Sequence, residues 1–550
     1  MTEVHKNIKH VFILLILSYF FFIFGNGIVS LTNPDEVFYV QTAKEMAKHA
    51  SWLVPYLFDA PNFEKPVFLY WFLRIGFILF GISSFAARFF PAVFAGLGAV
   101  SVYYLSLLGF KDSRKAFYSA LVLMSSGFYI GLARTVFTDM VFSVFILLSL
   151  LSFLWGYLRR ENKGLSLIAF SVCSAFAVLT KGPLGLIIPL LTVILFLWFR
   201  HEVSYLWCAY AVWGILIFIA VALPWYMYMF TKYKNAFTRE FFYNDHIRRL
   251  MEAEHKANDT WYFYPLSMIY CMFPWSIFAI VSLFSLAKRR LRQEEPAYLF
   301  LACWIVVVFV VFQAAHSKLA SYIFPLFSAL SLLIGDYVCN IIDDKKNTFA
   351  TVLFILTWCT LLVLPIALIV GPIAYMGYIP VKTPLYFFVF FIFCLLLAML
   401  RFILRREFFK VIVLLALIVP TMLLIVPFIK SDIDPYVSSR AAGEYVVKNT
   451  DANSIILCSK PFVRGVRYYT DRKVAVISSR GNNFFSPHPI AFLDSDEKVK
   501  DFLLNQSVTY CVLKKSSVKD IERIAEQGFD FTILKTIGNE YILRVQPVKK

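Results

Sequence analysis

The chain has 550 residues, of which 60% are apolar, 18% aromatic and 16% charged. A soluble domain carries about 25% charged and about 45–50% apolar residues, and its large exposed shell leaves no room to hide a greater apolar share. The composition therefore excludes an ordinary soluble enzyme, a disordered chain and a collagen-like chain, and predicts a polytopic membrane protein. The net charge of +18 does not indicate a nucleic-acid partner, because the basic residues form short clusters between apolar runs.

Apolar runs long enough to cross a bilayer, about 20 residues each, recur along the chain as far as residue 429. We expect about thirteen transmembrane helices, in the runs 11–29, 83–110, 115–132, 137–158, 165–180, 183–199, 206–229, 263–286, 296–314, 318–338, 349–372, 383–403 and 410–428. A further run at 67–82 does not fit the alternation of basic loops, and we expect an interfacial or re-entrant helix there.

Basic residues assign the two sides of the membrane. Lys6 and Lys9 precede the first run and favour a cytoplasmic N-terminus, and the basic cluster at 111–115 then also lies on the cytoplasmic side. The loops 30–66 and 230–262 fall on the outer side, together with everything after residue 430. The sequence therefore predicts a large, polar outer face.

The chain after residue 429 has a different composition, in which helix-like and β-rich stretches alternate. The helix-like stretches are 436–449, 496–505 and 516–526, and the β-rich runs are 455–458, 474–477, 508–512 and 541–545. We therefore expect a transmembrane domain at 1–429, with its outer loop and interfacial helices at 30–82, and a soluble extracytoplasmic α/β domain at 430–550. Cys458 and Cys511 could pair in this domain, which the sequence alone leaves open.

Ionisable side chains gather at the outer ends of the apolar runs, where their cost makes them functional candidates. The set comprises Asp35, Glu36, Tyr39, Glu64, Lys65, Arg134, Asp139, Lys181, His246, Arg248, Arg249, Lys318 and Tyr322. The cations of such a set suit a phosphate, and the carboxylates suit the deprotonation or orientation of a nucleophile. The pattern predicts a reaction between polar groups at the membrane surface.

Each of these side chains also has a structural explanation. Asp35 could cap a helix, Asp139 could interact with a helix dipole, and the lysines could be interfacial anchors. Arg248, Arg249 and His246 could belong to a solvated surface. A transporter or flippase is a further alternative, but it predicts ionisable groups near the bilayer midplane, whereas the charges here lie at one face.

The segment Leu31-Thr32-Asn33-Pro34-Asp35-Glu36 resembles the first outer loop of the lipid A aminoarabinose transferases. These enzymes belong with the protein O-mannosyltransferases to the GT-C class of glycosyltransferases that use polyprenyl-phosphate sugars. Further matching segments follow in the same order: Trp52-Leu53-Val54-Pro55, Glu64-Lys65-Pro66, Ala86-Ala87-Arg88, Leu179-Thr180-Lys181-Gly182-Pro183, Phe273-Pro274-Trp275-Ser276 and Ser317-Lys318-Leu319. The family's Glu-Lys-Pro-Pro reads Glu64-Lys65-Pro66-Val67 here. The resemblance implies a GT-C fold, which agrees with the crossing count and the outer domain.

The resemblance also implies roles for the outer residues. Asp35, Asp139 and Glu36 are the expected catalytic carboxylates, and Glu64 with His246 is a pair that could hold a divalent cation, the one cofactor expected. The expected substrate-binding residues are Tyr39, Lys65, Arg134, Lys181, Arg248, Arg249, Lys318 and Tyr322. The implied location is a bacterial inner membrane, among its lipids, with the active site and the C-terminal domain in the periplasm.

The implied reaction is the transfer of a sugar from a polyprenyl (undecaprenyl) phosphate donor with inversion at the anomeric carbon. The expected acceptor is lipid A or a related glycolipid, and the alternative is a protein Ser/Thr hydroxyl, as in the protein O-mannosyltransferases. Polyprenyl phosphate leaves as an anion, so the reaction needs cations rather than a general acid.

Overall fold

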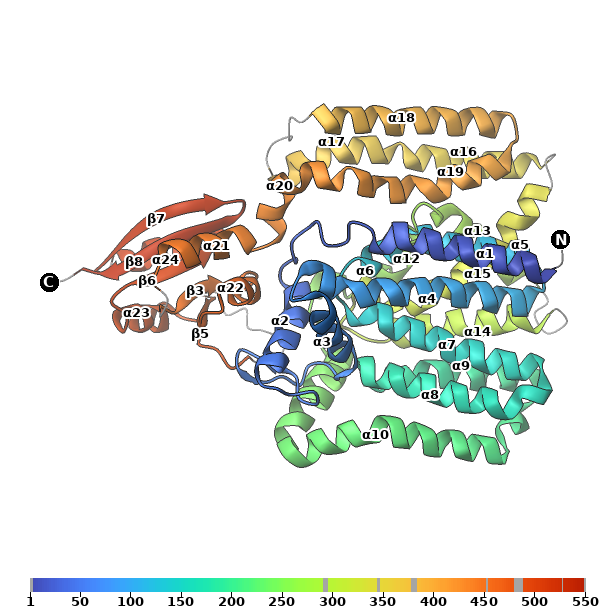
Figure 1. Ribbon diagram of the computed structural model, residues 1–550, viewed down its shortest axis with the longest axis horizontal. Helices are drawn as coiled ribbons and strands as arrows, with labels where there is room; N and C mark the ends of the chain where they lie inside the picture. The colour runs from blue at the N-terminus through green and yellow to red at the C-terminus, as the bar shows by residue number, and fades with distance from the viewer. Residues whose placement is uncertain are drawn as a thin grey trace.

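Long helices run side by side in a bundle in this computed structural model, and an α/β domain lies at one end of the bundle (Figure 1). The structure describes residues 3–289, 295–343, 347–376, 383–451, 454–478, 488–526 and 528–548. The N-terminus lies at the end of the bundle opposite to the α/β domain. We call the end that carries the α/β domain the outer end.

The bundle is built of α-helices that are joined by short turns. Its helices are α1 (Glu3–Ser18), α4 (Ser84–Phe110), α5 (Ser113–Ser125), α6 (Gly127–Ala133), α7 (Thr138–Leu158), α8 (Lys163–Lys181), α9 (Leu184–Arg200), α10 (Ala209–Phe237), α12 (Phe263–Cys271), α13 (Ser276–Lys288), α14 (Pro296–Gln313), α15 (Pro325–Asp343), α16 (Thr348–Leu361), α17 (Val363–Met376), α18 (Thr383–Leu404) and α19 (Phe408–Thr421). Shorter 3-10 and π segments are η1 (Tyr19–Ile23), η2 (Arg160–Asn162), η3 (Val203–Leu206), η5 (Lys256–Asn258), η6 (Ala320–Ile323) and η7 (Met422–Leu424). Helices α16 to α19 lie together along one side of the bundle (Figure 1).

The described residues contain 9 helices that are long and apolar enough to cross a membrane, or up to 11 if each of two bent pairs is one span. The bent pairs are α5 with α6, and α19–η7 with α20 (Val426–Val437). Two more of the predicted runs coincide with the shorter apolar helices α9 and α13. The chain is thus an integral membrane protein with many spans, as the composition predicts.

A small group of elements covers the outer end of the bundle. It consists of α2 (Asp35–Lys48), the hairpin β1 (Tyr56–Leu57) and β2 (Ala60–Pro61), α3 (Phe68–Phe80), the π-helical segment η4 (Thr238–Ile247) and α11 (Arg248–Met251). Helix α3 has 13 residues and is therefore about 20 Å long, too short for the ~30 Å hydrocarbon core. Its length fits the interfacial helix expected at 67–82.

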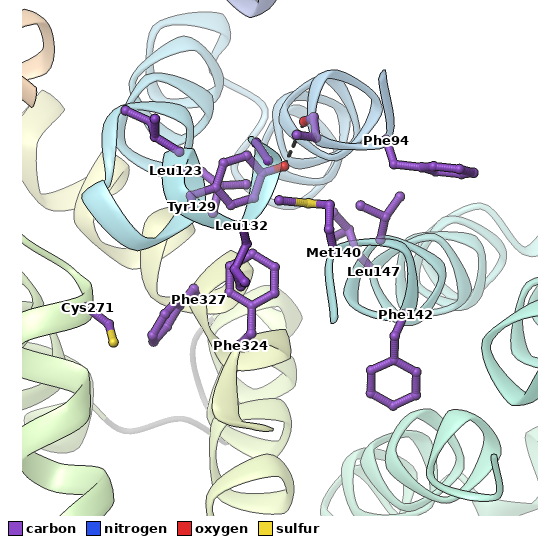
Figure 2. Close-up of a cluster of buried hydrophobic side chains, with 14 of the residues drawn as sticks. Phe94, Leu123, Tyr129, Leu132, Met140, Phe142, Leu147, Cys271, Phe324 and Phe327 are labelled. Carbon is purple, nitrogen blue, oxygen red and sulfur yellow. Dashed lines mark hydrogen bonds between the residues drawn. The ribbon is translucent and has the colours of Figure 1, made fainter. Parts of the chain in front are cut away.

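Aromatic and aliphatic side chains from several helices fill the centre of the bundle (Figure 2). Tyr129 of α6 is buried there, and its hydroxyl donates a hydrogen bond to the carbonyl of Ala95 on α4 at 2.7 Å. Phe324 stacks near the Tyr129 ring, with 5.6 Å between centroids. Because this packing fixes the helices against one another, it also fixes the side chains at their outer ends.

The C-terminal domain contains a mixed six-stranded sheet in the order β5-β4-β3-β6-β8-β7. Its strands are β3 (Ile456–Ser459), β4 (Val474–Ile477), β5 (Phe492–Leu493), β6 (Thr509–Leu513), β7 (Phe529–Ile537) and β8 (Glu540–Pro547), and its helices are α21 (Arg440–Asn449), α22 (Val463–Thr470), α23 (Asp496–Leu504) and α24 (Lys515–Ala525). Strands β3, β4, β5 and β6 pair in parallel, and β8 joins β6 and β7 antiparallel. The predicted α/β domain is confirmed, and the expected boundary at 429–430 falls inside α20.

The sheet register separates Cys458 from Cys511. Cys511 pairs with Leu457 across the strands, and Cys458 pairs with Val512. Because side chains alternate along a strand, the two thiols point to opposite faces of the sheet. Both cysteines are free in this fold, so they do not form the pair that the sequence left open.

A compact polar cluster lies at the inner end of the bundle. The carboxylate of Asp336 on α15 is buried and lies 2.6 Å from Lys115 Nζ and 3.6 Å from Arg289 Nη2. The hydroxyl of Tyr298 donates to the same carboxylate at 2.9 Å. The cavity beside these groups has a volume of about 10 Å³, room for no more than about one water. We call this group the inner lock.

Candidate active site

Asp245 is the centre of a buried charge cluster at the outer end of the bundle. Its Oδ2 accepts a hydrogen bond from Lys65 Nζ at 2.5 Å, and its Oδ1 lies 2.9 Å from Arg249 Nε. Arg249 also donates to the hydroxyl of Tyr322 at 2.8 Å and lies 2.8 Å from Glu254. One buried carboxylate therefore holds two cations that belong to segments far apart in sequence.

A second ion pair adjoins the first. Lys181 Nζ donates to Asp139 Oδ1 at 2.5 Å, and it lies 4.7 Å from the centroid of the Tyr322 ring. Tyr322 thus contacts both Lys181 and Arg249, and burial raises its pKa to about 12 although Arg249 lowers it. The tyrosine remains a neutral hydroxyl between two cations at neutral pH.

Local sequence explains why these groups meet. Asp139 lies in the first turn of α7, and Lys181 is the last residue of α8. Gly182 follows with φ +94°, and a Cβ at this position would lie 2.5 Å from His246 Nε2. Glycine is therefore required both for the turn and for the close approach of η4. The π-helical geometry of η4 is of a kind that is frequent at functional sites.

The C-terminal domain contributes two side chains to the same region. Arg464 of α22 lies 3.6 Å from the carboxylate of Asp35 and donates to His488 Nε2 at 2.9 Å. His488 Nε2 lies 3.8 Å from Glu64 Oε1. Burial raises the pKa of Glu64, although Arg464 and Lys65 oppose the shift. The outer domain therefore forms one wall of the candidate site.

Asp35 is the first residue of α2, and 61% of its side chain is exposed. Pro34, and not Asp35, occupies the N-cap position, so the capping explanation does not hold. Tyr39 lies one turn further, buried between Tyr70 and Phe137, and burial followed by the charge of Asp139 raises its pKa. Asp35 is thus an accessible carboxylate at the rim of the buried charges.

Glu36 was expected to be one of the catalytic carboxylates, but its surroundings are those of a buried residue that stabilises the fold. It is fully buried, and its two oxygens accept hydrogen bonds from Arg88 Nε and Nη2, both at 2.6 Å. The backbone amides of Thr32 and Val136 donate to the same carboxylate. A carboxylate with every lone-pair direction occupied suits the positioning of its neighbour Asp35.

Three expected substrate-binding residues lie away from the cluster. Arg134 donates to the carbonyls of Phe21 and Phe24 at the end of η1. Arg248 pairs with Glu252 at the surface. Lys318 pairs with Asp259 at 3.3 Å. The structure therefore brings together Lys65, Lys181, Arg249 and Tyr322 of the predicted set, with Tyr39 beside them.

The expected cation pair, Glu64 and His246, does not form a metal site in this arrangement. His246 Nδ1 lies 2.7 Å from the carbonyl oxygen of Phe241, and its Nε2 lies against Gly182. Glu64 faces His488 instead. Within the described ranges, no group of three or more His, Cys, Asp or Glu side chains could hold a metal ion. A divalent cation remains a prediction from the resemblance alone.

The residues of this region for which the sequence predicted no role share one property: their partners are distant in the chain. Asp245 lies 180 residues from Lys65, although its spacing of four residues from Arg249 on a helix was a signal that could have found it. Arg88 was a lone cation in an apolar run, and such a residue needs a buried partner. Arg464 and His488 carried no such signal.

Comparisons with known proteins agree with this geometry. Residues 7–238 match the family of dolichyl-phosphate-mannose-protein mannosyltransferases. The undecaprenyl phosphate-alpha-4-amino-4-deoxy-L-arabinose arabinosyl transferase of Yersinia pestis (strain Pestoides F) is 30% identical over 321 residues, which cover 58% of this chain and 57% of that protein. The enzyme of the same name from Photorhabdus laumondii is 27% identical over 320 residues, with the same coverage. The chain thus spans about 57% of the length of these curated relatives.

Solved structures share the fold over the whole chain. ArnT from Cupriavidus metallidurans bound to undecaprenyl phosphate has a TM-score of 0.77 at 17% identity, covering 99% of this chain and 98% of its own. The Archaeoglobus fulgidus oligosaccharyltransferase has a TM-score of 0.54 at 13% identity, covering 96% and 69%. The resemblance predicted from the motifs is confirmed: over 58% of its length the chain is similar to these aminoarabinose transferases, and it has the fold of ArnT.

Proposed function

We propose that this chain is a membrane glycosyltransferase that moves a sugar from a polyprenyl-phosphate donor to an envelope acceptor. The single observation that carries the proposal is the gathering of three cations at the outer ends of the helices: Arg249 and Lys181 contact Tyr322, and Lys65 shares the carboxylate of Asp245 with Arg249. Cations held at fixed positions in a buried site stabilise an anion as its charge develops. Polyprenyl phosphate is such an anion, and its chain would lie in the bilayer.

The reaction has one bond-forming and one bond-breaking event. The acceptor oxygen forms a bond to the anomeric carbon, while the bond from that carbon to the phosphate oxygen breaks and its electron pair stays on polyprenyl phosphate. Attack from the face opposite to the phosphate inverts the anomeric centre. Lys65, Arg249 and Lys181 neutralise the phosphate, and Asp139 and Asp245 hold these cations in place.

The acceptor decides the role of Asp35. A hydroxyl acceptor must lose a proton, and Asp35, accessible at the rim of the cluster, is the base that receives it. A phosphate acceptor is already ionised, and Asp35 then orients it or stabilises positive charge on the sugar. The homologous enzymes named above favour an aminoarabinose-type transfer to lipid A or a related glycolipid on the periplasmic face. The family match of residues 7–238 keeps transfer to protein Ser/Thr as the second candidate.

The test uses the purified full-length chain in lipid nanodiscs with undecaprenyl phosphate aminoarabinose and lipid A. The wild type should add one pentosamine to lipid A, as measured by mass spectrometry. Asp35→Asn should lose all activity if the acceptor is a hydroxyl, and should retain part of its activity if the acceptor is a phosphate. Glu444→Gln on α21, an exposed carboxylate away from the site, is the control. Wild-type turnover by Asp35→Asn would remove Asp35 from the mechanism, and an unchanged lipid A mass would favour the protein acceptor.

A further inference from the structure

A cavity of about 250 Å³ lies beside Glu64, on the side of the C-terminal domain. Leu57, Pro61 and Pro489 supply apolar walls, and Asn62, Glu240 and His488 supply polar groups. These residues come from the β1–β2 hairpin, from η4 and from the chain that precedes β5. A small set of polar groups on an apolar wall is the usual composition of a small-molecule site. The roles assigned above to the charge cluster leave this cavity without a function.

Asn62 presents an unused hydrogen-bond donor at this cavity. Its side chain is 5% exposed, and its Oδ1 accepts a hydrogen bond from the amide of Glu64 at 3.2 Å. Its Nδ2 has no hydrogen-bond partner in the part of the chain that the structure describes. A buried donor without a partner lowers the stability of the fold. Such a donor at a cavity wall indicates that a bound ligand accepts its hydrogen bond.

Glu240 brings a carboxyl group without a partner among the described residues to the same cavity, and burial, followed by the charges of Glu64 and Asp245, raises its pKa to about 8. No described residue forms an ion pair or a side-chain hydrogen bond with its carboxylate, and the charges that act on it are those of Glu64 and Asp245. The cations of the cluster are occupied elsewhere, because Lys65 and Arg249 pair with Asp245. A cation bound beside Glu240 would stabilise the ionised form of this carboxyl and lower its pKa, so the cavity favours a cationic ligand group.

His488 does not supply that cation. Burial, together with the charges of Arg464 and Lys460, lowers its pKa to about 3, so the ring is neutral at physiological pH. Arg464 donates to Nε2, and the neutral ring then carries its proton on Nδ1. The same Arg464 lies 3.6 Å from Asp35. Arg464 therefore connects His488, in the wall of the cavity, with Asp35, the proposed reacting carboxylate.

We infer that this cavity binds the ring of an amino sugar, whose ammonium group pairs with Glu240 while Asn62 Nδ2 donates a hydrogen bond to a ring hydroxyl. The apolar walls formed by Leu57, Pro61 and Pro489 suit the C–H face of the ring. This inference rests on the proposed glycosyl transfer and makes Glu240 a specificity-determining residue. The amino sugar belongs either to the donor or to the acceptor, and the experiment distinguishes the two sources.

The donor arm compares two substrates with the full-length protein in nanodiscs: undecaprenyl phosphate aminoarabinose and the matched donor with a hydroxyl in place of the amine. The release of undecaprenyl phosphate gives kcat and KM for each. If the donor sugar occupies the cavity, the wild type prefers the amine donor, and Glu240→Gln lowers that preference about 10- to 100-fold, the scale of one hydrogen bond to a charged group. The effect is on KM for the amine donor, with the neutral donor unchanged.

The acceptor arm uses an acceptor with a free amino-sugar ring and its N-acetylated form. If the acceptor occupies the cavity, Glu240→Gln removes the preference for the free amine and leaves the donor ratio as in the wild type. Asn62→Ala is the second variant, because it removes the Nδ2 donor without adding a negative charge to the cavity. It should raise KM for the same substrate pair. Glu497→Gln on α23, an exposed carboxylate, is the matched control.

Two outcomes contradict the proposals separately. Equal selectivity of the wild type and Glu240→Gln in both arms overturns the amino-sugar site while turnover itself supports the proposed function. A wild type that releases no undecaprenyl phosphate from either donor contradicts the glycosyl transfer instead. Glu240→Gln that loses activity equally with all substrates also overturns the inference, because a structural role would act on every substrate alike.

Discussion

Two buried carboxylates organise the opposite ends of the bundle, and their surroundings differ. At the inner lock, Asp336 is paired with Lys115 and Arg289 and accepts a hydrogen bond from Tyr298, and the adjoining cavity has a volume of about 10 Å³. At the outer end, Asp245 holds two cations, but polar groups without partners remain nearby around a cavity of about 250 Å³. Both are buried charge clusters, so burial and charge alone do not separate a structural lock from a site.

The difference lies in the space beside each cluster and in the charges that are left without a partner. A buried charge is tolerated when it is paired and hydrogen-bonded. The inner lock meets that condition with side chains that four helices of the bundle bring together. The outer cluster has spare donors, an uncompensated acid and an accessible carboxylate at its rim. Buried polar atoms without a hydrogen-bond partner occur in both clusters, but only the outer one adjoins a cavity large enough for a ligand. This contrast leads to tests that act differently on the two ends.

Lys65→Met should produce the largest effect. It removes a cation from the proposed phosphate position while Asp245 keeps its contact with Arg249. We expect kcat/KM to fall by about 100- to 1,000-fold, the cost of deleting one electrostatic contact to a developing anion. The measurement is donor turnover in nanodiscs, and Lys115→Met at the inner lock is the matched control, for which turnover per folded molecule should stay at the wild-type value. A wild-type rate for Lys65→Met would show that the outer cluster, like the inner lock, has no part in the reaction.

Asp336→Asn should act on stability and not on chemistry. Lys115 and Arg289 would then face a neutral amide, and breaking a buried pair by removing one partner costs about 3–5 kcal/mol. We expect a lower unfolding temperature in detergent, with turnover of the folded fraction unchanged. A loss of turnover at full stability would show that the inner lock takes part in the reaction.

Gly465→Ala should weaken the contact between the C-terminal domain and the first loop. A Cβ at this position would lie 2.1 Å from Asn33 Oδ1, so α22 must shift away from the segment that carries Asp35. We expect a decrease in kcat of about 10- to 100-fold, the scale of a displacement of about 1 Å at a reacting group. Gly371→Ala on α17, where nothing lies within 4 Å, is the control. Equal activity of both variants would mean that the outer domain does not position Asp35.

Glu540→Gln should give the smallest effect, on the pH dependence of stability. Burial raises the pKa of Glu540 from 4.5 to about 8, and Ser439 donates to this carboxyl while accepting from Asn33 of the first loop. The folded pKa exceeds the unfolded one, so the stability from this group is present below pH 4.5 and is lost as the pH rises through about 8. The variant should therefore lose less stability than the wild type between pH 5 and pH 9, as thermal unfolding would measure. Identical curves would contradict the raised pKa.

The sequence predicted the fold well because the bilayer imposes a strong rule. Apolar runs must be helical in lipid, so the helices could be located from hydropathy alone. The β-rich runs at 455–458 and 508–512 became β3 and β6 because such buried parallel strands read as continuous apolar segments. Helix α22 was missed: it has only 8 residues and a polar composition, and its place depends on its contacts with α2.

The site was predicted as a set of residues but not as a set of contacts. Lys65, Lys181, Arg249 and Tyr322 were identified because each ends or adjoins an apolar run on one side of the membrane. Their partners follow from the helix packing, which no local pattern encodes. Glu36 shows the same limit, because its role became clear only when Arg88 was placed against it.

The contact between α22 and the first loop has a consequence for biosynthesis. Arg467 of α22 pairs with Glu45 of α2, which lies 422 residues earlier, and also with Asp59 beside the hairpin. The segment with Asp35 leaves the ribosome early, yet its partners are made only after every span has been inserted. A nascent or truncated polypeptide thus holds the segment with Asp35 without its support, and these contacts close only after the last part of the chain has been made and folded.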